Sequence, residues 1–366
     1  YDVFKNFALS MLGIFIPIIL YQSSGGLMLP GIYLLTKTFT GVLAGFPVMK
    51  SINLYGFRSG LAASYVFLLP AILMIYLLES SIALVMVVAI LYSIGSTYHR
   101  ESMNLEFEED SRNDSRDEDA ARLFSLPNIG RLLGPLVGGV LSALFSFQVM
   151  LLTAMAAVLI SLVPARSIDL KSEPKNLDFR DLFQREYLEY MPIFVSRGIQ
   201  ALTSVALFSL FTYVFVAGSI SSGAVRSMDT IGFMIVAYIS GKISSKYGRT
   251  RIIVTGLTMA GLTYLARILV QTPLEAFTVS LIGGIAFKLY HIPLFSEFAD
   301  EAGRKDERSF YASKKLFNSL GKTITIILFL TTAILFTERT AFTFIFMLAS
   351  ISTVVLILGQ KFVESN

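Results

Sequence analysis

The chain contains two histidines, and each directly follows a tyrosine, in Tyr98-His99 and in Tyr290-His291. Imidazole is the side chain whose ordinary pKa lies closest to neutral pH, so histidines are natural proton carriers. Two interpretations fit this pattern. The histidines could carry a coupling proton or contact a solute, or each Tyr-His pair could hydrogen-bond neighbouring helices as a structural brace.

Each histidine is matched by a permanently charged basic residue that lies about as far after a predicted turn as the histidine lies before it. His99 lies sixteen residues before Ser115, and Arg131 lies sixteen residues after it. If two antiparallel helices turn near Ser115, both side chains lie at the same depth, about 24 Å from the turn at about 1.5 Å per residue. The same count around the corresponding turn in the second half puts His291 level with Lys322. We therefore expect a histidine and a base at one level in each half.

Other polar residues join these four as candidates for contact with a solute or a proton. They are Arg100, Glu101, Arg197, Gln200 and Lys288. Bases outnumber acids in the combined set, and an uncompensated positive cavity attracts negative charge. The set therefore favours an anionic or zwitterionic solute.

The elements that must position these residues are membrane-spanning helices. The chain is 54% hydrophobic and 15% charged, whereas soluble domains carry about 25% charged residues. Its apolar residues come in blocks of 17 or more, the length that a helix needs to cross about 30 Å of hydrocarbon. Backbone groups in lipid must be paired within the segment, so these blocks predict helices. A charge inside such a helix costs about 2.5–3.5 kcal/mol and needs a reason to be there.

We expect twelve of these helices. The first six lie near Phe4–Tyr21, Leu27–Met49, Gly60–Leu78, Ile82–Phe107, Leu123–Phe145 and Val149–Val163. The second six lie near Met191–Val216, Val225–Ile243, Ile252–Val270, Leu274–Phe298, Phe310–Phe336 and Ala341–Phe362. The predicted fold is an all-α membrane protein with one six-helix bundle in residues 1–164 and a second in residues 191–366.

The two halves resemble each other at an offset of about 192 residues. The first half contains Tyr98-His99, Glu106-Phe107, Arg112, Leu123-Phe124 and Gly130-Arg131. In the same order, the second contains Tyr290-His291, Glu297-Phe298, Arg304, Leu316-Phe317 and Gly321-Lys322. The spacing slips by only a residue, so we infer two pseudo-symmetric copies of one six-helix unit with the same topology. Transporters are commonly built this way, with the solute site near mid-membrane where the repeats meet.

The segment Ala165–Tyr190 divides the chain near its middle. Its apolar residues recur at roughly helical spacing: Leu177, Phe179, Leu182, Phe183, Tyr187 and Leu188. Charged residues fill most of the positions between them, which is typical of a helix lying on the membrane surface. We expect a cytoplasmic linker with such a helix, and the alternative is a plain tether between the halves.

Basic residues mark one set of loops, as they do in the cytoplasmic loops of membrane proteins. This set holds Lys50, Arg58, Arg166, Lys171, Lys175, Arg180, Arg185, Lys246, Arg249, Arg251, Arg304, Lys305 and Arg308, and the opposite loops are nearly bare. With an even number of crossings, we expect both termini in the cytoplasm and the protein in the plasma (cytoplasmic) membrane. Bases in these short loops also suit contact with anionic lipid headgroups.

Several classes of function lack support in the sequence. The chain has no cysteine, which excludes thiol catalysis and metal–thiolate sites. It has no Gly-Lys-Ser/Thr phosphate loop and no nucleophile elbow, so neither ATP-driven transport within the chain nor hydrolase chemistry is expected. The acidic segment Glu101–Asp119 predicts a solvated helix extension rather than a metal site. We expect no enzyme activity, no metal or other cofactor, no nucleic-acid partner and a monomer.

One predicted cytoplasmic loop carries a specific motif. Residues 241–251 read Gly-Lys-Ile-Ser-Ser-Lys-Tyr-Gly-Arg-Thr-Arg. Through Gly241, Gly248 and Arg249, this loop resembles the signature that the major facilitator superfamily carries between the second and third helices of each half. Ser245 stands where that family has an aspartate, a residue thought to engage a neighbouring helix end in one conformation.

The first half keeps a weaker copy of this signature. Gly56 and Arg58 keep the spacing of the signature's glycine and basic residue, and Asn53 again stands in place of the aspartate. Basic residues in the same loops fix the helix ends against anionic headgroups.

The fifth predicted helix contains a glycine–proline pattern made of Gly130, Gly134, Pro135, Gly138 and Gly139. Small residues four apart let helices approach closely, and proline removes a backbone donor and permits a bend. The pattern is similar to the one associated with proton-coupled exporters of the superfamily. It predicts a role in helix packing or in gating, and the two roles can coincide.

The resemblance implies a secondary transporter of a small-molecule substrate that works by rocker-switch alternating access. The first, fourth, seventh and tenth helices would line its path. We expect a proton-coupled antiporter that exports an anionic or amphipathic compound. The alternatives are a transporter for uptake of a sugar or an organic anion, a lipid flippase or scramblase, and a scaffold or receptor that transports nothing.

Overall fold

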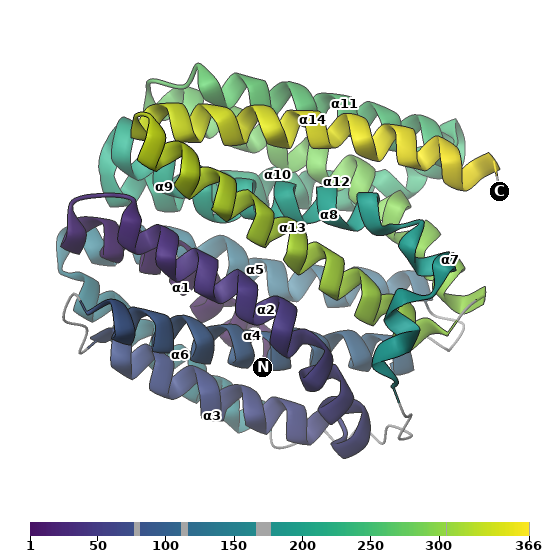
Figure 1. Ribbon diagram of the computed structural model, residues 1–366, viewed down its shortest axis with the longest axis horizontal. Coiled ribbons are helices and arrows are strands. Elements are labelled where there is room, and N and C mark those ends of the chain that lie inside the picture. Colours follow the sequence, from purple (N-terminus) through teal and green to yellow (C-terminus); the bar gives the residue numbers. More distant parts are fainter. Residues whose placement is uncertain (77–80, 111–115, 166–176, 305, 366) are drawn as a thin grey trace. The chain divides into compact units, whose positions relative to one another are not determined.

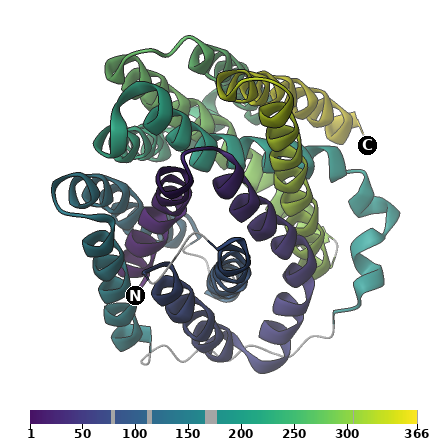
Figure 2. The ribbon, with the colours of Figure 1, turned by 60° about the vertical axis from the view of Figure 1, so that its left-hand side comes forward.

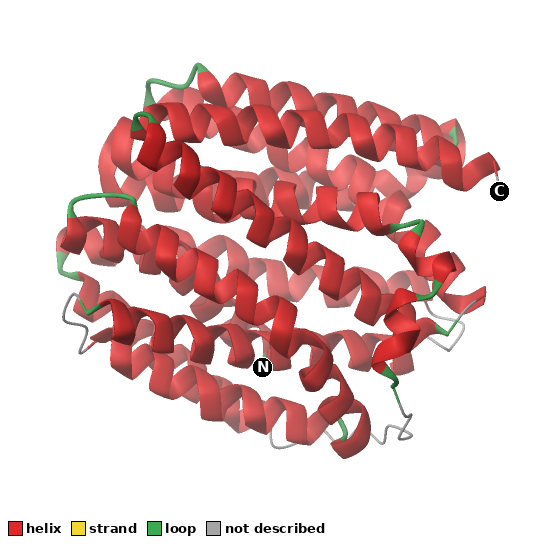
Figure 3. Cartoon of the chain, viewed as in Figure 1, coloured by secondary structure: helices red, strands yellow, loops and turns green. Residues whose placement is uncertain are grey.

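The computed structural model describes the backbone of residues 1–76, 81–110, 116–165, 177–304 and 306–365. It describes the side chains of residues 1–76, 81–103, 127–164, 177–236, 248–298, 306 and 308–359. Every regular element within these ranges is a helix (Figure 3). The predicted all-α fold is therefore confirmed. The chain divides into two compact units, Tyr1–Asp181 and Leu182–Asn366.

The first unit contains six long helices (Figure 1). They are α1 (Asp2–Ser24), α2 (Met28–Tyr55), α3 (Phe57–Tyr76), α4 (Ile82–Asp110), α5 (Arg116–Leu144) and α6 (Phe147–Ala165). A short turn, dark purple in Figure 2, joins α1 to α2. Gly25 makes this turn in the left-handed region at φ 69°, and its amide donates to the carbonyl oxygen of Tyr21. Glycine accepts this conformation because it has no Cβ.

The second unit begins with a helix that is not uniform. It runs through α8 (Met191–Leu202), the π-helical segment η2 (Thr203–Leu207), α9 (Phe208–Thr212) and the π-helical segment η3 (Tyr213–Ala217). The sequence predicts a plain helix over this range. Short π-helical segments are rare and occur often at functional sites.

Five further helices complete the second unit. They are α10 (Gly218–Tyr247), α11 (Arg249–Ile268), α12 (Pro273–Arg304), α13 (Glu307–Leu335) and α14 (Glu338–Ser365). The twelve predicted helices are thus all present. The predicted ends differ most at the starts of α5 and α10, which begin at Arg116 and Gly218 rather than near Leu123 and Val225. At both starts the helix continues into polar residues outside the apolar block. A hydropathy pattern does not detect a helix end made of polar residues.

Nine helical stretches of the described residues are long and apolar enough to cross a membrane. One of them, Met191–Val236, covers the seventh helix and much of α10. The helices α5 and α11 lie outside this set. Arg131 lies inside α5, and α11 carries Arg249 and Arg251 in its first turn and Arg267 in its last. Such residues lower the mean hydropathy of a segment.

The helices of the two units pair in the same order. In the first unit, α1 packs against α5 and α6, α4 packs against α2 and α3, and α3 contacts α6. In the second unit, α8 packs against α13 and α14, α12 packs against α10 and α11, and α11 contacts α14. Each pair of the first unit therefore has a counterpart in the second. The duplication read from the sequence corresponds to a duplicated packing arrangement.

The turn between the second and third helices of each unit uses a glycine with positive φ. Gly56 has φ 84° and ψ 171°, and Gly248 has φ 86° and ψ 139°. The two glycines lie 192 residues apart, which is the offset of the sequence repeat. Both copies of the loop signature therefore contain a glycine that the backbone requires.

The segment before the second bundle differs from the single surface helix that the sequence suggested. It contains a 3-10 helix, η1 (Phe179–Phe183), and a four-residue helix, α7 (Arg185–Leu188). Leu182 and Tyr187 are almost fully buried. Ser313 of α13 donates to the carbonyl oxygen of Leu182 at 2.8 Å. Leu182 and Tyr187 pack into the second unit, whereas Phe179, Phe183 and Leu188 are exposed; the helical spacing alone could not show this division. Residues 166–176 of the linker lie outside the described chain.

Glycines of α5 allow the backbone of α1 to come close. A Cβ added to Gly130 would lie 2.2 Å from the carbonyl oxygen of Val3, and one added to Gly134 would lie 2.3 Å from that of Phe7. At Gly138 the added atom would meet a side chain of α1 at 2.6 Å. The predicted packing interpretation of this motif therefore has a direct structural basis.

The second unit repeats this close approach between α8 and α13. An added Cβ on Gly321 would lie 2.1 Å from the carbonyl oxygen of Val195, and one on Gly198 would lie 2.1 Å from that of Asn318. Gly321 is the repeat equivalent of Gly130. Close packing of the first and fifth helices is thus common to both units.

We expect Gly134→Ala to destabilise the protein, because its Cβ would collide with the rigid backbone of α1, and overpacking costs about 1–3 kcal/mol. The matched control is Gly13→Ala in α1. Its Cβ would meet only the Tyr92 hydroxyl, at 3.9 Å, so alanine should be neutral or stabilise the helix by up to about 1 kcal/mol. Thermal unfolding in detergent, followed by circular dichroism, measures both. Equal melting temperatures for the two variants would contradict the packing argument.

Candidate functional site

A fully buried lysine lies at the centre of a polar cluster in the first unit. Lys5 of α1 donates to Ser64 Oγ at 2.5 Å, and its ammonium nitrogen lies 3.6 Å from the centre of the Tyr65 ring. The Tyr65 hydroxyl is 2.9 Å from Ser161 Oγ of α6. A hydroxyl oxygen and a ring face both stabilise a cation without adding a negative charge. Helices α1, α3 and α6 thus hold Lys5 in place.

His99 belongs to the same region and is 5% exposed. Its Nδ1 lies 2.8 Å from the hydroxyl of Tyr1, and the two rings meet edge to face at 5.7 Å. Arg131 donates from Nε to Asn6 Oδ1 at 3.0 Å. Both Arg131 and Lys5 act electrostatically on His99. The structure therefore brings together the histidine and the base that the sequence placed at one level.

The residues after His99 differ in exposure. Arg100 is exposed, whereas Glu101 is 7% exposed. Ser102 is fully buried, and its Oγ has no hydrogen-bond partner among the described residues. Of the two predicted charged candidates on this turn of α4, only Glu101 is buried within the fold.

A second lysine of the first unit lies among tyrosines. The ammonium nitrogen of Lys37 in α2 is 4.6 Å from the ring centre of Tyr92 and 5.8 Å from that of Tyr33. Tyr33 is fully buried, and its hydroxyl has no hydrogen-bond partner in the described part of the chain. The pattern of Lys5, a cation against a ring face, thus occurs twice in this unit.

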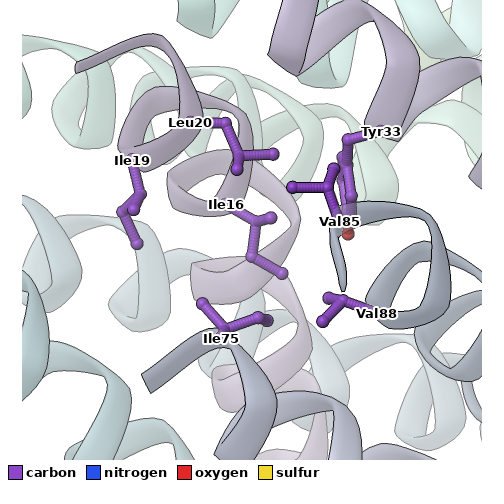
Figure 4. Close-up of a pocket in the computed structure, with 7 residues that line it drawn as sticks. All are labelled: Ile16, Ile19, Leu20, Tyr33, Ile75, Val85 and Val88. Carbon is purple, nitrogen blue, oxygen red and sulfur yellow. The ribbon is translucent and has the colours of Figure 1, made fainter. Parts of the chain in front are cut away.

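Tyr33 also borders a small recess, shown in Figure 4. The recess is lined by Ile16, Ile19, Leu20, Tyr33, Ile75, Val85 and Val88. The Tyr33 hydroxyl is the one polar side-chain atom among these residues, and the space is too narrow to hold a water molecule. This recess is a feature of packing, and it has no room for a solute.

In the second unit, hydrogen bonds link three helices through Tyr290. Arg197 of α8 donates from Nη1 to the Tyr290 hydroxyl at 2.7 Å. That hydroxyl donates to Gln200 Oε1 at 2.7 Å, and Gln200 Nε2 donates to Ser352 Oγ of α14 at 3.2 Å. Tyr290 and Gln200 are at most 1% exposed. The predicted candidates Arg197 and Gln200 therefore belong to one buried network.

This network continues through the first π-helical segment to a buried arginine. The Tyr264 hydroxyl lies 3.4 Å from the carbonyl oxygen of Gln200 and 2.9 Å from Ser204 Oγ of η2. Arg267 donates from Nη1 to Ser204 Oγ at 3.2 Å, and its guanidinium lies 4.4 Å from the Phe208 ring centre. Arg267 is 2% exposed. The segment η2 thus supplies the hydroxyl that joins α11 to α8.

An ion pair lies on α10 within the same unit. Arg226 donates from Nη1 to Asp229 Oδ2. Asp229 also acts electrostatically on Arg267 and on Tyr290. The carboxylate near the network is therefore already paired with a base.

His291 has surroundings unlike those of its repeat equivalent. Its ring lies 4.9 Å from that of Phe287 and 6.2 Å from that of Phe295. It is half-buried, whereas His99 is buried and bonded to a tyrosine hydroxyl. A structural brace common to both halves would place the two histidines in like environments. The structure places them in different ones.

The two predicted lysines of the second unit are both within the bundle. Lys288 is 2% exposed, and its ammonium nitrogen lies 3.8 Å from the centre of the Phe233 ring. Lys322 of α13 is half-buried. Arg197, Lys288 and Lys314 all act electrostatically on His291.

The motif residues occupy helix ends and helix contacts. Asn53 is buried at the end of α2, and Arg58 and Arg249 are exposed at the starts of α3 and α11. Pro135 and Gly139 are buried in α5. The surroundings of Gly241 and Ser245 lie outside the described residues. These positions shape the helix ends and contacts rather than a solute-binding surface.

Several residues of these networks were missed by sequence reasoning, namely Lys5, Lys37, Ser204, Tyr264 and Lys314. Lys5 and Lys37 carried a usable signal, because each is a lysine within a predicted membrane helix. Serines and tyrosines are common in such helices, so nothing marked Ser204 or Tyr264 before the π-helical segment was known. Among the described side chains, no group of three or more His, Cys, Asp or Glu residues is placed to hold a metal ion.

Comparison with known proteins supplies the family. The family model of the Major Facilitator Superfamily matches residues 3–321. Among solved structures, the chain resembles the crystal structure of a POT family transporter in complex with 5-aminolevulinic acid. The TM-score is 0.73 with 13% sequence identity, over 98% of this chain and 94% of the other. No curated protein sequence matches the chain.

The chain belongs to the major facilitator superfamily. It is an integral membrane protein with multiple spans and a secondary transporter that binds a small-molecule substrate, and it is not an enzyme. The structural likeness at 13% identity establishes the fold alone.

We expect Tyr290→Phe to destabilise the protein more than Tyr98→Phe, its repeat equivalent. Tyr290 joins Arg197 to Gln200, so loss of its hydroxyl removes a partner from the buried Gln200 amide, at about 1–3 kcal/mol, and from the half-buried Arg197 guanidinium. Among the described residues, the hydroxyl of the half-buried Tyr98 forms a hydrogen bond with Ser51 Oγ at 2.9 Å. Thermal unfolding in detergent compares the two variants. A melting temperature lowered equally by both would show that the network adds nothing to an ordinary tyrosine hydrogen bond.

Proposed function

We propose that this transporter exports a small anionic or amphipathic solute in exchange for protons. The observation that carries the proposal is the nature of its buried cations. Lys5, Arg267 and Lys288 are at most 2% exposed, and each contacts a hydroxyl oxygen or a ring face. Contacts of this kind stabilise a cation without adding a negative charge, which supports a path that favours anions.

The acids described near these cations are few. Asp2 acts electrostatically on Lys5, and Asp229 acts on Arg267 but is paired with Arg226. A cationic solute would need a buried carboxylate as its partner. The balance of buried charge therefore supports an anion or an amphipathic molecule with an anionic group.

Proton coupling is supported by the positions of the two histidines. His99 lies within electrostatic range of Arg131 and Lys5, and His291 lies within range of Arg197 and Lys288. Loss of a proton from either histidine reduces the positive charge around a bound anion. A proton on a histidine and a bound anion would thus influence each other's binding, as coupled transport requires. Exchange, rather than co-transport, rests on the glycine–proline pattern of α5.

Export is supported by the glycine–proline pattern of α5, which resembles that of proton-coupled exporters. Gly130 and Gly134 allow close contact with α1, and movement along this contact would change access to the path. The bases Arg58, Arg249 and Arg251 at the α2–α3 and α10–α11 turns are exposed. They support a cytoplasmic location for these turns and for both termini. We take the transporter to act as a monomer in the plasma membrane.

Flux measurements in proteoliposomes test the coupling. The probes are labelled 2-naphthoate, citrate, glucose and tetraphenylphosphonium, each with and without a pH gradient. We expect an anion among these probes to move against its own gradient when the pH gradient is imposed, and the glucose and cation fluxes to stay at the level of protein-free vesicles. Flux of glucose or of the cation alone would overturn the proposed solute class.

Histidine variants separate coupling from a structural role. We expect His99→Ala combined with His291→Ala, which leaves no histidine in the chain, to lower pH-driven flux at least about tenfold. Exchange of labelled for unlabelled anion at equal pH should persist, because exchange needs alternating access but no net proton movement. Loss of both fluxes would indicate a brace, and retention of both would show that the histidines do not couple. Movement of a labelled phospholipid at the rate of the anion would instead favour a lipid flippase or scramblase.

A further inference from the structure

One face of α12 carries three rings in a row. Phe287, His291 and Phe295 are four residues apart, and residues at this spacing share a face of a helix. Their ring centres are 4.9 Å and 6.2 Å apart in sequence order. Phe233 of α10 extends the row by stacking on Phe287 at 6.3 Å and 23°. All four rings are half-buried, and we refer to them as the aromatic row.

Cations from three helices lie over this aromatic row. The guanidinium of Arg197 in α8 lies 4.9 Å from the centre of Phe287. The ammonium of Lys288 in α12 lies 3.8 Å from Phe233, and that of Lys314 in α13 lies 5.0 Å from Phe295. A cation over a ring face is stabilised by the quadrupole of the ring and keeps its full charge. Rings and positive charge therefore alternate along one surface of the second unit.

Asp229 is paired with Arg226. Glu297 follows Phe295 by two residues, which places it about 200° around the helix from that ring. Arg197 and Lys314 are half-buried, as the four rings are.

We propose that the aromatic row and its bases bind a solute that combines a planar aromatic ring with a carboxylate or similar anionic group. This assignment rests on the proposed function and names its substrate class. The anionic group would pair with the fork of N–H donors on Arg197. The ring would stack on Phe287 and His291, in the offset or edge geometry that aromatic rings prefer.

This arrangement discriminates among related solutes. A saturated ring of the same shape keeps the ion pair but loses ring–ring interaction. A neutral aromatic amide keeps the stacking but loses the charge-assisted hydrogen bonds, which are about twice as strong as neutral ones. An aromatic cation would be repelled by the three bases.

Equilibrium binding of 2-naphthoate to the full chain in lipid nanodiscs tests the proposal. The chain contains no tryptophan, so naphthoate fluorescence is read without that background, and empty nanodiscs give the lipid contribution. We expect decahydro-2-naphthoate to compete about 2- to 12-fold more weakly than 2-naphthoate, from the energy of an aromatic pair. The amide 2-naphthamide should compete at least about tenfold more weakly.

Two variants should each remove one of these preferences. Phe287→Leu should bring naphthoate and its saturated analogue to near-equal affinity, and Arg197→Gln should do the same for naphthoate and its amide. The matched controls are Phe344→Leu and Arg339→Gln on α14, where both side chains are exposed. Arg197→Lys keeps the charge and should keep the preference for the anion. Circular dichroism checks that each variant is folded.

The ligand series on the unaltered chain decides the outcome even if a variant fails to fold. Equal affinity for naphthoate and its saturated analogue would overturn the proposal, as would an unchanged preference in folded Phe287→Leu. Failure here is distinct from failure of the proposed function. If naphthoate does not bind but pH-driven citrate flux occurs, this inference alone is wrong. If naphthoate binds as expected but no anion flux occurs, the export proposal is wrong.

Discussion

A cation enclosed among membrane helices must be stabilised without water, and much of the interior of this protein follows from that constraint. Several of its buried lysines and arginines contact ring faces and hydroxyls, as in Lys5 over Tyr65 and Arg267 over Phe208. These partners remove part of the cost of burial and leave the charge in place. The class of solute proposed above rests on this set of buried cations.

The two units share a backbone plan and differ in chemistry. Both pack their first and fifth helices through glycine contacts, and both turn between the second and third helices at a glycine with positive φ. At equivalent positions, however, Tyr98 contacts a serine, whereas Tyr290 joins an arginine to a glutamine. The duplicated unit therefore supplies the packing, and divergence between the copies places the equivalent tyrosines in different polar surroundings.

Prediction from sequence succeeded where one physical effect dominated. Hydropathy located the helices because each apolar block must cross the same thickness of hydrocarbon. The glycines of α5 were identified because close helix contact requires small residues. Prediction failed where several effects compete. The π-helical segment η2 has no compositional signal. In the linker, Leu182 and Tyr187 are buried in short helices while Phe179, Phe183 and Leu188 are exposed, so contacts with the bundle outweigh regular helical spacing there.

The sequence by itself determined the number of helices, their duplication, the membrane class and the family resemblance, because each depends on patterns repeated along many residues. Tertiary structure alone decided which polar groups meet. It brought His99 to a tyrosine hydroxyl and set His291 between two phenylalanines, although the sequence presents the two as equals. It also joined Arg197, Gln200 and Arg267 into one hydrogen-bonded network through Tyr290, Tyr264 and Ser204. Such contacts depend on the rotation and local winding of each helix, which differ by fractions of a turn that hydrophobic patterns do not resolve.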